Sequence, residues 1–172
     1  MNDEEAEQLI LQWLAHACFF IQNEQGYTLV TDPYTESIGY PVPKEIKADI
    51  VTISHEHTDH NNAGVVTGNP LVIRTAGTQE ALGFRVTGIP TDHDEKGGQV
   101  RGNNMMYIIE TEGLRICHCG DLGRMLTEEE TKQIGHVDIL LSLIHIFGCA
   151  KAGQKRLYGL FRGLIGIETP FF

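Results

Sequence analysis

Several features are scarce or missing in this sequence of 172 residues. No apolar run reaches the roughly 18 residues that a membrane-spanning helix needs, so we expect no membrane span. Only 13 Lys and Arg stand against 23 Asp and Glu, and the net charge of −10 argues against a nucleic-acid partner. The acidic start, Met1–Glu5, lacks the basic and apolar pattern of a signal peptide. The four cysteines form no disulfide framework, which predicts reduced thiols and a cytoplasmic location.

The composition and length fit one folded domain. Hydrophobic residues make up 41% and charged residues 21%, close to the average of globular proteins. Short β-rich runs joined by turns predict a mixed α/β fold with a meander of strands rather than alternating βαβ units. We expect strands at Leu9–Leu14, Cys18–Gln22, Tyr27–Thr31, Ile50–Ser54, Leu71–Arg74, Phe84–Ile89, Met105–Glu110, Leu114–Cys119 and Val137–Leu140.

Two helices are also expected. The first is a short helix near Thr78–Leu82, stopped by Gly83. The second begins at a capping box formed by Thr127 and Glu130 and ends at Gly135.

Three histidines and an aspartate are concentrated in the segment His55–His60, which follows the apolar run Ile50–Ser54 directly. In an extended chain, residues two apart point the same way, so His55 and His57 can converge on one metal ion. Asp59 and His60, where the chain turns, can then face a second ion. Imidazole and carboxylate suit zinc, and also iron or manganese. The alternative is a solvated polar loop, which such dense ligand spacing disfavours.

These residues resemble the metal-binding motif of the metallo-β-lactamase superfamily. Further segments are similar to the branch of ascorbate-phosphate lactonases and N-acyl-phosphatidylethanolamine phosphodiesterases, and the order and spacing hold from about Leu9 to Leu140. The matching segments are His55-x-His57-x-Asp59-His60, Trp13-Leu14-Ala15-His16, Thr31-Asp32-Pro33-Tyr34, Ile89-Pro90-Thr91-Asp92-His93-Asp94 and Cys117-His118-Cys119-Gly120-Asp121. One departure is Ala15, which stands where this branch usually has glycine.

The resemblance implies a fold, a site and an activity. The fold is an αββα sandwich of the metallo-β-lactamase type. The site has one or two zinc ions, with manganese or iron as alternatives. The first ion is held by His55, His57 and His93, the second by Asp59 and His60, and Asp121 bridges both. The implied reaction is hydrolysis of a small-molecule ester, lactone or phosphodiester by a hydroxide between the two ions, with Asp59 and Asp121 as catalytic residues.

Four further polar residues near these motifs are candidates for roles other than metal binding. His16 and Asp32 are expected either to line the site behind the ligands or simply to pack. His118 is expected to support a ligand or to lie in the core. Arg124 is a candidate contact for an anionic substrate.

The resemblance ends near Leu140, where the charge also changes sign. Up to that residue the chain has 9 basic and 22 acidic residues, and from Leu141 to Phe172 it has 4 basic and 1 acidic. The hexapeptide Leu141–Ile146 looks like a translated transposon-end adapter, and we therefore interpret residues 141–172 as a foreign tail on a truncated domain, 1–140. The alternative is a basic amphipathic helix around Leu157–Leu164.

This interpretation affects the expected function. A full member of the family needs one more histidine for the second ion, and His145 is not assigned to that role because it lies in the adapter-like segment. The chain is then expected to hydrolyse poorly. Two other functions remain open: a metal-binding scaffold without catalysis, and a non-hydrolytic redox relative with two irons.

Overall fold

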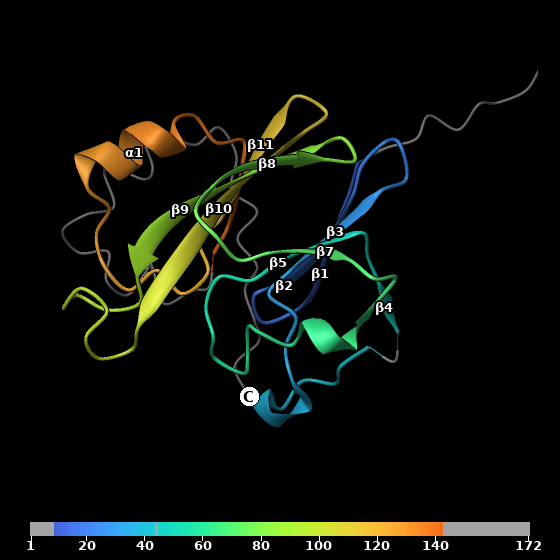
Figure 1. Ribbon diagram of the computed structural model, residues 1–172, viewed down its shortest axis with the longest axis horizontal. Coiled ribbons are helices and arrows are strands. Elements are labelled where there is room, and N and C mark those ends of the chain that lie inside the picture. Colours follow the sequence, from blue (N-terminus) through green and yellow to red (C-terminus); the bar gives the residue numbers. More distant parts are fainter. Residues whose placement is uncertain (1–8, 44, 143–172) are drawn as a thin grey trace, which may run out of the picture.

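Two five-stranded sheets form the body of the protein (Figure 1), which is described here from a computed structural model covering residues 9–43 and 45–142. The first sheet has the order β1-β2-β3-β5-β7, with strands β1 (Ile10–Ala15), β2 (Cys18–Gln22), β3 (Thr28–Thr31), β5 (Ile50–Thr52) and β7 (Leu71–Ile73). The second has the order β12-β11-β10-β9-β8, with strands β8 (Gly77–Ala81), β9 (Phe84–Asp92), β10 (Asn103–Thr111), β11 (Leu114–His118) and β12 (Ile139–Leu141). The smaller elements are helix α1 (Glu128–Ile134), the 3-10 helices η1 (Glu36–Ile38) and η2 (Ala63–Val65), and the strand pair β4 (Ile46–Lys47) and β6 (Val66–Thr67).

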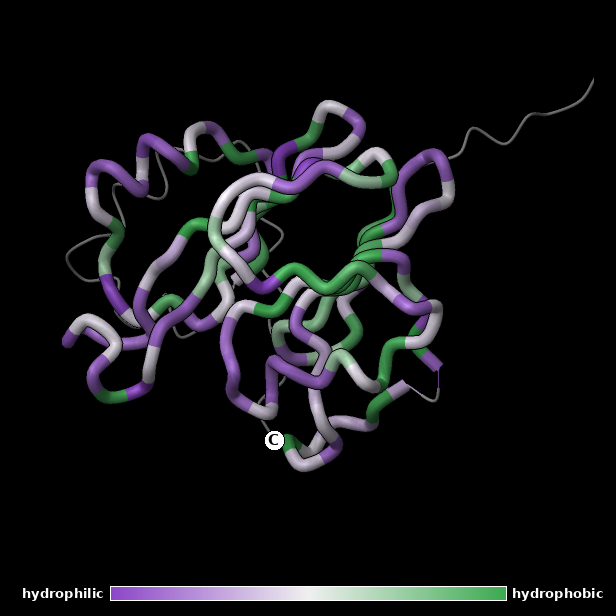
Figure 2. Tube along the Cα trace, in the orientation of Figure 1, coloured by the Kyte–Doolittle hydropathy of each residue, from purple (hydrophilic) through white to green (hydrophobic). Residues whose placement is uncertain are grey.

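The main core lies between the two sheets. Alternate residues of each strand face inward, as the two-residue period of a strand requires. In β10, Tyr107 and Ile109 join this core, while Met106 and Ile108 face the other side of the sheet. The inward residues of both sheets form one buried cluster: Phe19, Ile21, Leu29, Ile50, Ile73, Phe84, Val86, Tyr107, Ile109, Ile116 and Leu141. Figure 2 shows hydrophobic residues along these strands and hydrophilic residues on the loops and on α1.

Each sheet also has a covered outer face. On the first sheet, Val30 and Val51 pack with Tyr34 and with Ile46 of β4. On the second, helix α1 (labelled in Figure 1) contributes a side chain to the outer cluster, because Ile134 is buried there. The predicted α/β sandwich is thereby confirmed.

Helix α1 begins and ends as the sequence predicts. The Thr127 side chain accepts a hydrogen bond from the Glu130 amide, and the Glu130 carboxylate accepts one from the Thr127 amide. The backbone N–H of Gly135 donates to the carbonyl of Thr131 at the other end. The predicted capping box is confirmed.

The helix expected near Thr78–Leu82 is wrong, because these residues form strand β8 and its turn. Strand β8 pairs antiparallel with β9, from Gly77 opposite Gly88 to Ala81 opposite Phe84. Leu82 and Gly83 both have positive φ, 54° and 79°, as the central residues of a tight hairpin turn require. Gly83 therefore closes a hairpin instead of ending a helix, and pairing along β9 outweighs the local helix propensity.

The predicted meander is confirmed for β8 to β11 of the second sheet, which pair antiparallel in sequence order, but only for part of the first sheet. Strands β1, β2 and β3 pair antiparallel in sequence order, whereas β3, β5 and β7 pair in parallel. Parallel pairing places the ends of β3 and β5 at the same edge of the sheet. The hairpin expected between the strands near Met105–Glu110 and Leu114–Cys119 is present as β10 and β11.

The boundary expected at residue 141 lies where the described residues end. Leu141 belongs to β12, which pairs in parallel with β11, and its side chain is buried between the sheets. Residues 143–172, with His145 and the alternative helix at Leu157–Leu164, lie outside the described residues. In the part of the chain that is described, no helix has the length and hydropathy to cross a membrane.

Candidate metal centre

The site lies where five loops leave the ends of strands. Strands β1, β3 and β5 run in one direction, since β2 is antiparallel to both β1 and β3. Strands β9 and β11 likewise share a direction, because each is antiparallel to β10. The loops after these five strands carry the polar residues of the site: His16, Asp32, His55–His60, His93 and Asp121. Strand direction therefore brings together residues that are far apart in the sequence.

Three predicted ligands form the first donor group. One ligand atom from each of His55, His57 and His93 lies within 4.8 Å of the others. Nε2 of His55 is 3.0 Å from Nδ1 of His57. His55 and His93 are buried, while His57 is exposed.

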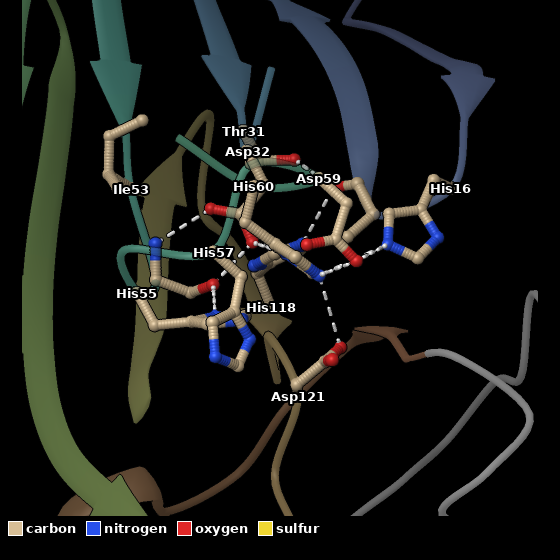
Figure 3. Close-up of polar contacts among 12 residues, drawn as sticks. His16, Thr31, Asp32, Ile53, His55, His57, Asp59, His60, His118 and Asp121 are labelled. Carbon is tan, nitrogen blue, oxygen red and sulfur yellow. Dashed lines mark hydrogen bonds and ion pairs between the residues drawn. The ribbon is translucent and has the colours of Figure 1, made fainter. Parts of the chain in front are cut away.

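The remaining three predicted ligands lie beside this group (Figure 3). Nε2 of His60 is 3.4 Å from Oδ1 of Asp121 and 3.7 Å from Oδ2 of Asp59. The other oxygen of Asp121, Oδ2, is 3.1 Å from Nε2 of His93. One oxygen of Asp121 thus faces His60, and the other faces His93 of the first group.

His16 joins the second group, although the sequence only placed it near the site. Its Nε2 is 3.1 Å from Nε2 of His60 and 3.2 Å from Oδ2 of Asp59. These three residues form a further set of possible ligands within 4.8 Å of one another. Its resemblance motif, Trp13-Leu14-Ala15-His16, was the signal that pointed to it.

Asp32 lies behind the ligands and orients two of them. Its fully buried carboxylate accepts hydrogen bonds from the amide of Ser54 (2.7 Å) and the hydroxyl of Ser54 (2.5 Å), and lies 2.7 Å from Nδ1 of His60. With the proton of His60 on Nδ1, the Nε2 lone pair points at the site. The Ser54 hydroxyl is also 2.9 Å from Nδ1 of His55, so the same arrangement leaves Nε2 of His55 facing His57. Of the two roles that the sequence left open for Asp32, the geometry supports positioning of the ligands.

Close backbone contacts place the Asp121 loop. The Asp121 amide donates to Oδ1 of Asn104 (2.9 Å), and the Asn104 side-chain amide donates to the carbonyl of Cys119 (2.9 Å). A Cβ on Gly120 would lie 2.4 Å from Asn104 Oδ1, and one on Gly123 would lie 2.0 Å from the carbonyl oxygen of His93. Glycine at 120 lets this loop approach Asn104 and Ser54, and glycine at 123 lets it pack against the loop of His93.

The residues of the two donor groups shift one another's pKa values. Although burial disfavours its charged form, hydrogen bonds with Asp121 and Asp32 raise the pKa of His60 to about 10. Burial and the neighbouring His60 lower the pKa of His55 to about 4 and also lower that of His16. Burial opposes ionisation of Asp121, but its hydrogen bond with His60 and the nearby histidines bring its pKa well below the usual range.

His118 and Arg124 do not face the donor groups as ligands. His118 is buried between the sheets, and its Nε2 is 2.9 Å from the carbonyl oxygen of Ala17. The Arg124 guanidinium binds the Asp92 carboxylate at 2.5 Å and both carboxylate oxygens of Glu130 at 2.7 and 2.9 Å. These contacts connect the end of β9 to the start of α1. Arg124 also lines a cleft beside the first donor group, so its contact with an anionic substrate stays a prediction.

An open cleft of about 640 Å³ adjoins the first donor group. His55 and His57 form part of its wall. Arg74 and Arg101 also line it, and Arg74 is paired there with Glu56 at 3.4 Å.

The spacing of the donor atoms fits a metal ion. In a tetrahedral site with bonds of about 2.0–2.1 Å, neighbouring ligand atoms lie about 3.3 Å apart. The distances among the facing donors of the two groups run from 3.0 to 3.7 Å. The structure therefore brings all six predicted ligands together at metal-site spacing, and their binding of metal remains a prediction.

Comparison with known proteins agrees with this geometry. A family model described as "Beta-lactamase superfamily domain" matches residues 10–158. The chain belongs to this family, within the metallo-β-lactamase superfamily, and the predicted fold class is confirmed.

Individual relatives are more distant. A UPF0173 metal-dependent hydrolase of Thermoplasma acidophilum is 28% identical over 160 residues, covering 78% of this chain and 70% of the relative. A crystal structure from Thermotoga maritima, assigned as a Zn-dependent hydrolase of the metallo-β-lactamase superfamily, is 34% identical with a TM-score of 0.59. The match covers 77% of this chain and only 59% of the Thermotoga chain.

The fold alone is shared with a protein of different chemistry. The diiron β-hydroxylase CmlA of Streptomyces venezuelae is 20% identical with a TM-score of 0.56, over 78% of this chain and 34% of CmlA. Fold similarity at this level does not specify a reaction.

Proposed function

We propose that the chain is the metal-binding part of a dinuclear metal-dependent hydrolase. His55, His57 and His93 would hold one ion, Asp59 and His60 the second, and Asp121 would be shared. The observation that carries this proposal is the placement of Asp121, whose Oδ2 lies 3.1 Å from His93 Nε2 and whose Oδ1 lies 3.4 Å from His60 Nε2. A carboxylate with one oxygen toward each histidine group suits a bridge between two cations. Relatives named metal-dependent hydrolases support the same reading.

Zinc is the metal that we propose, with manganese or iron as alternatives, because the donors are imidazole nitrogens and carboxylate oxygens. Bound cations of this kind supply an activated water and polarise the oxygen of the bond under attack. The protein's residues then have separate tasks. Asp32 keeps the proton of His60 on Nδ1, and Asp59, whose side chain is 32% exposed, can accept a hydrogen bond from water and orient it.

The proposed substrates are small-molecule esters, lactones or phosphodiesters, cleaved in the cytoplasm. The proposed branch is the one similar to ascorbate-phosphate lactonases and N-acyl-phosphatidylethanolamine phosphodiesterases. Support for an anionic substrate comes from Arg101, which lines the cleft beside His57, while Arg74 in the same wall is paired with Glu56. An ester or phosphate group at His57 would lie next to both the ligands and this positive charge.

The test combines metal content with turnover. Purified protein is loaded with Zn²⁺ or Mn²⁺, analysed for metal by mass spectrometry, and assayed on a panel of bis(p-nitrophenyl) phosphate, lactones and aryl esters. His57→Ala should lose the first ion and the activity. His136→Ala is the matched control, because His136 is half exposed and contacts Asp138 away from the site. Equal metal and activity in both variants would refute the assignment, and two bound ions without turnover on any substrate would favour the scaffold or the redox alternative.

A further inference from the structure

We propose that His16 is a direct ligand of the second metal ion, which completes a four-donor site with Asp59, His60 and Asp121. The inference builds on the proposed dinuclear function and names a ligand beyond the predicted six. All four donors lie in the described part of the chain.

The donor distances are the first argument. His16 Nε2 lies 3.1 Å from His60 Nε2 and 3.2 Å from Asp59 Oδ2, and His60 Nε2 lies 3.4 Å from Asp121 Oδ1. Neighbouring ligands of a tetrahedral ion with bonds of about 2.0–2.1 Å are spaced at about 3.3 Å. Two imidazole nitrogens and two carboxylates form a donor set that suits zinc or manganese. Figure 3 shows the His16 ring pointing toward Asp59 and His60.

Hydrogen bonding alone explains these contacts less well. Nε2 of His60 carries at most one hydrogen, yet it faces Nε2 of His16 at 3.1 Å, Oδ1 of Asp121 at 3.4 Å and Oδ2 of Asp59 at 3.7 Å. His16 Nε2 carries at most one hydrogen, which it would have to share between Asp59 and His60. A cation between these nitrogen and carboxylate oxygen atoms, bound once His60 has released the hydrogen on Nε2, would accept a lone pair from each of them.

The backbone around His16 supports a positioned side chain. His16 occupies the turn between β1 and β2 with a φ of 50°, a value that costs a residue with a side chain about 1 kcal/mol or more. The indole N–H of Trp13 donates to the carbonyl oxygen of His16 (2.9 Å), and the neighbouring Ala15 and Ala17 are buried. A glycine would fit this turn without strain, so the presence of histidine points to its imidazole.

The test is a comparison of the wild type with His16→Gly. Glycine adopts the positive φ freely, which separates loss of the imidazole from loss of the fold. Zn²⁺ competition titration and Co²⁺ absorption spectra measure the two ions separately. The wild type should bind two ions. His16→Gly should keep the first and lose affinity for the second by more than the roughly 10–100-fold that loss of an outer hydrogen-bond partner costs.

Rescue and controls make the outcome decisive. Free imidazole added to His16→Gly should restore the second Co²⁺ signal, which a purely structural role of His16 would not allow. His136→Ala should bind as the wild type does. If His16→Gly binds two ions with wild-type affinity, or if imidazole restores nothing, the ligand role of His16 is refuted while the dinuclear proposal stands. If the wild type itself binds one ion or none, the dinuclear proposal fails instead.

Discussion

Asp32→Asn is the substitution whose effect follows most directly from the structure. The buried carboxylate accepts the Ser54 amide through Oδ1 and faces Nδ1 of His60 through Oδ2. Asparagine has the same shape but one oxygen fewer. The Ser54 amide requires an acceptor, so the new NH₂ group takes the place of Oδ2 and points its hydrogen at Nδ1 of His60. His60 must then carry its own proton on Nε2, the atom that faces His16 and Asp121, and a protonated Nε2 cannot bind a metal.

The magnitude follows from the role of an outer hydrogen-bond partner. Loss of such a partner lowers metal affinity about 10–100-fold, which corresponds to about 1.4–2.7 kcal/mol. We expect the affinity for the second ion to fall by this factor. The affinity for the first ion should fall less, because His55 is connected to Asp32 only through the Ser54 hydroxyl.

The assay is a competition titration with Zn²⁺, and long-range ¹⁵N NMR of the histidine rings reports the tautomer of His60. Asp49→Asn is the matched control. The Asp49 carboxylate also accepts two hydrogen bonds, from the amide and hydroxyl of Thr28, but at the opposite end of β3. Wild-type affinity for both ions in Asp32→Asn, with His60 still protonated on Nδ1, would refute the reasoning.

Further predictions concern stability, packing and the origin of the tail. The hydrogen bonds from Arg124 lower the pKa of Glu130 to about 2, so the pair stabilises the fold above pH 4.5 and loses this effect as the pH falls toward 2. Glu130→Gln should therefore cost about 1–2 kcal/mol at pH 7 in urea unfolding and almost nothing near pH 2; a constant difference at all pH values would contradict this. Gly123→Ala places a Cβ 2.0 Å from the His93 carbonyl oxygen. The substitution should destabilise the protein by roughly 1–3 kcal/mol and reduce the amount of bound metal. Wild-type stability and metal content would contradict this and show that the loop can move to make room. Tyr107→Phe removes the hydroxyl that lies 2.7 and 3.1 Å from the carbonyl oxygens of Ile53 and Ile73 and should cost about 1–3 kcal/mol, a loss that thermal unfolding would detect. Direct amplification of the locus without a transposon step should give a different sequence after residue 140, and an unchanged read of residues 141–172 would refute the foreign-tail hypothesis.

Local sequence was sufficient for the features that depend on neighbouring residues. Short β-rich runs bounded by turn residues predicted most strands, because β-branched and aromatic residues favour the extended backbone of a strand. The capping box of Thr127 and Glu130 predicted the start of α1, since both hydrogen bonds lie within four residues. The segment His55–His60 predicted a metal site because its ligands lie within six consecutive residues and can converge without help from distant parts of the chain.

The tertiary structure decided the features that depend on distant residues. Thr78–Leu82 has a locally helical composition, and only pairing with β9 makes it a strand. His16 is 44 residues from His60 in the sequence, and Asp32 is 28 residues away. No spacing rule connects them to the site. They meet because β1, β3 and β5 run in the same direction in one sheet, so that the loops after all three strands open at the same edge.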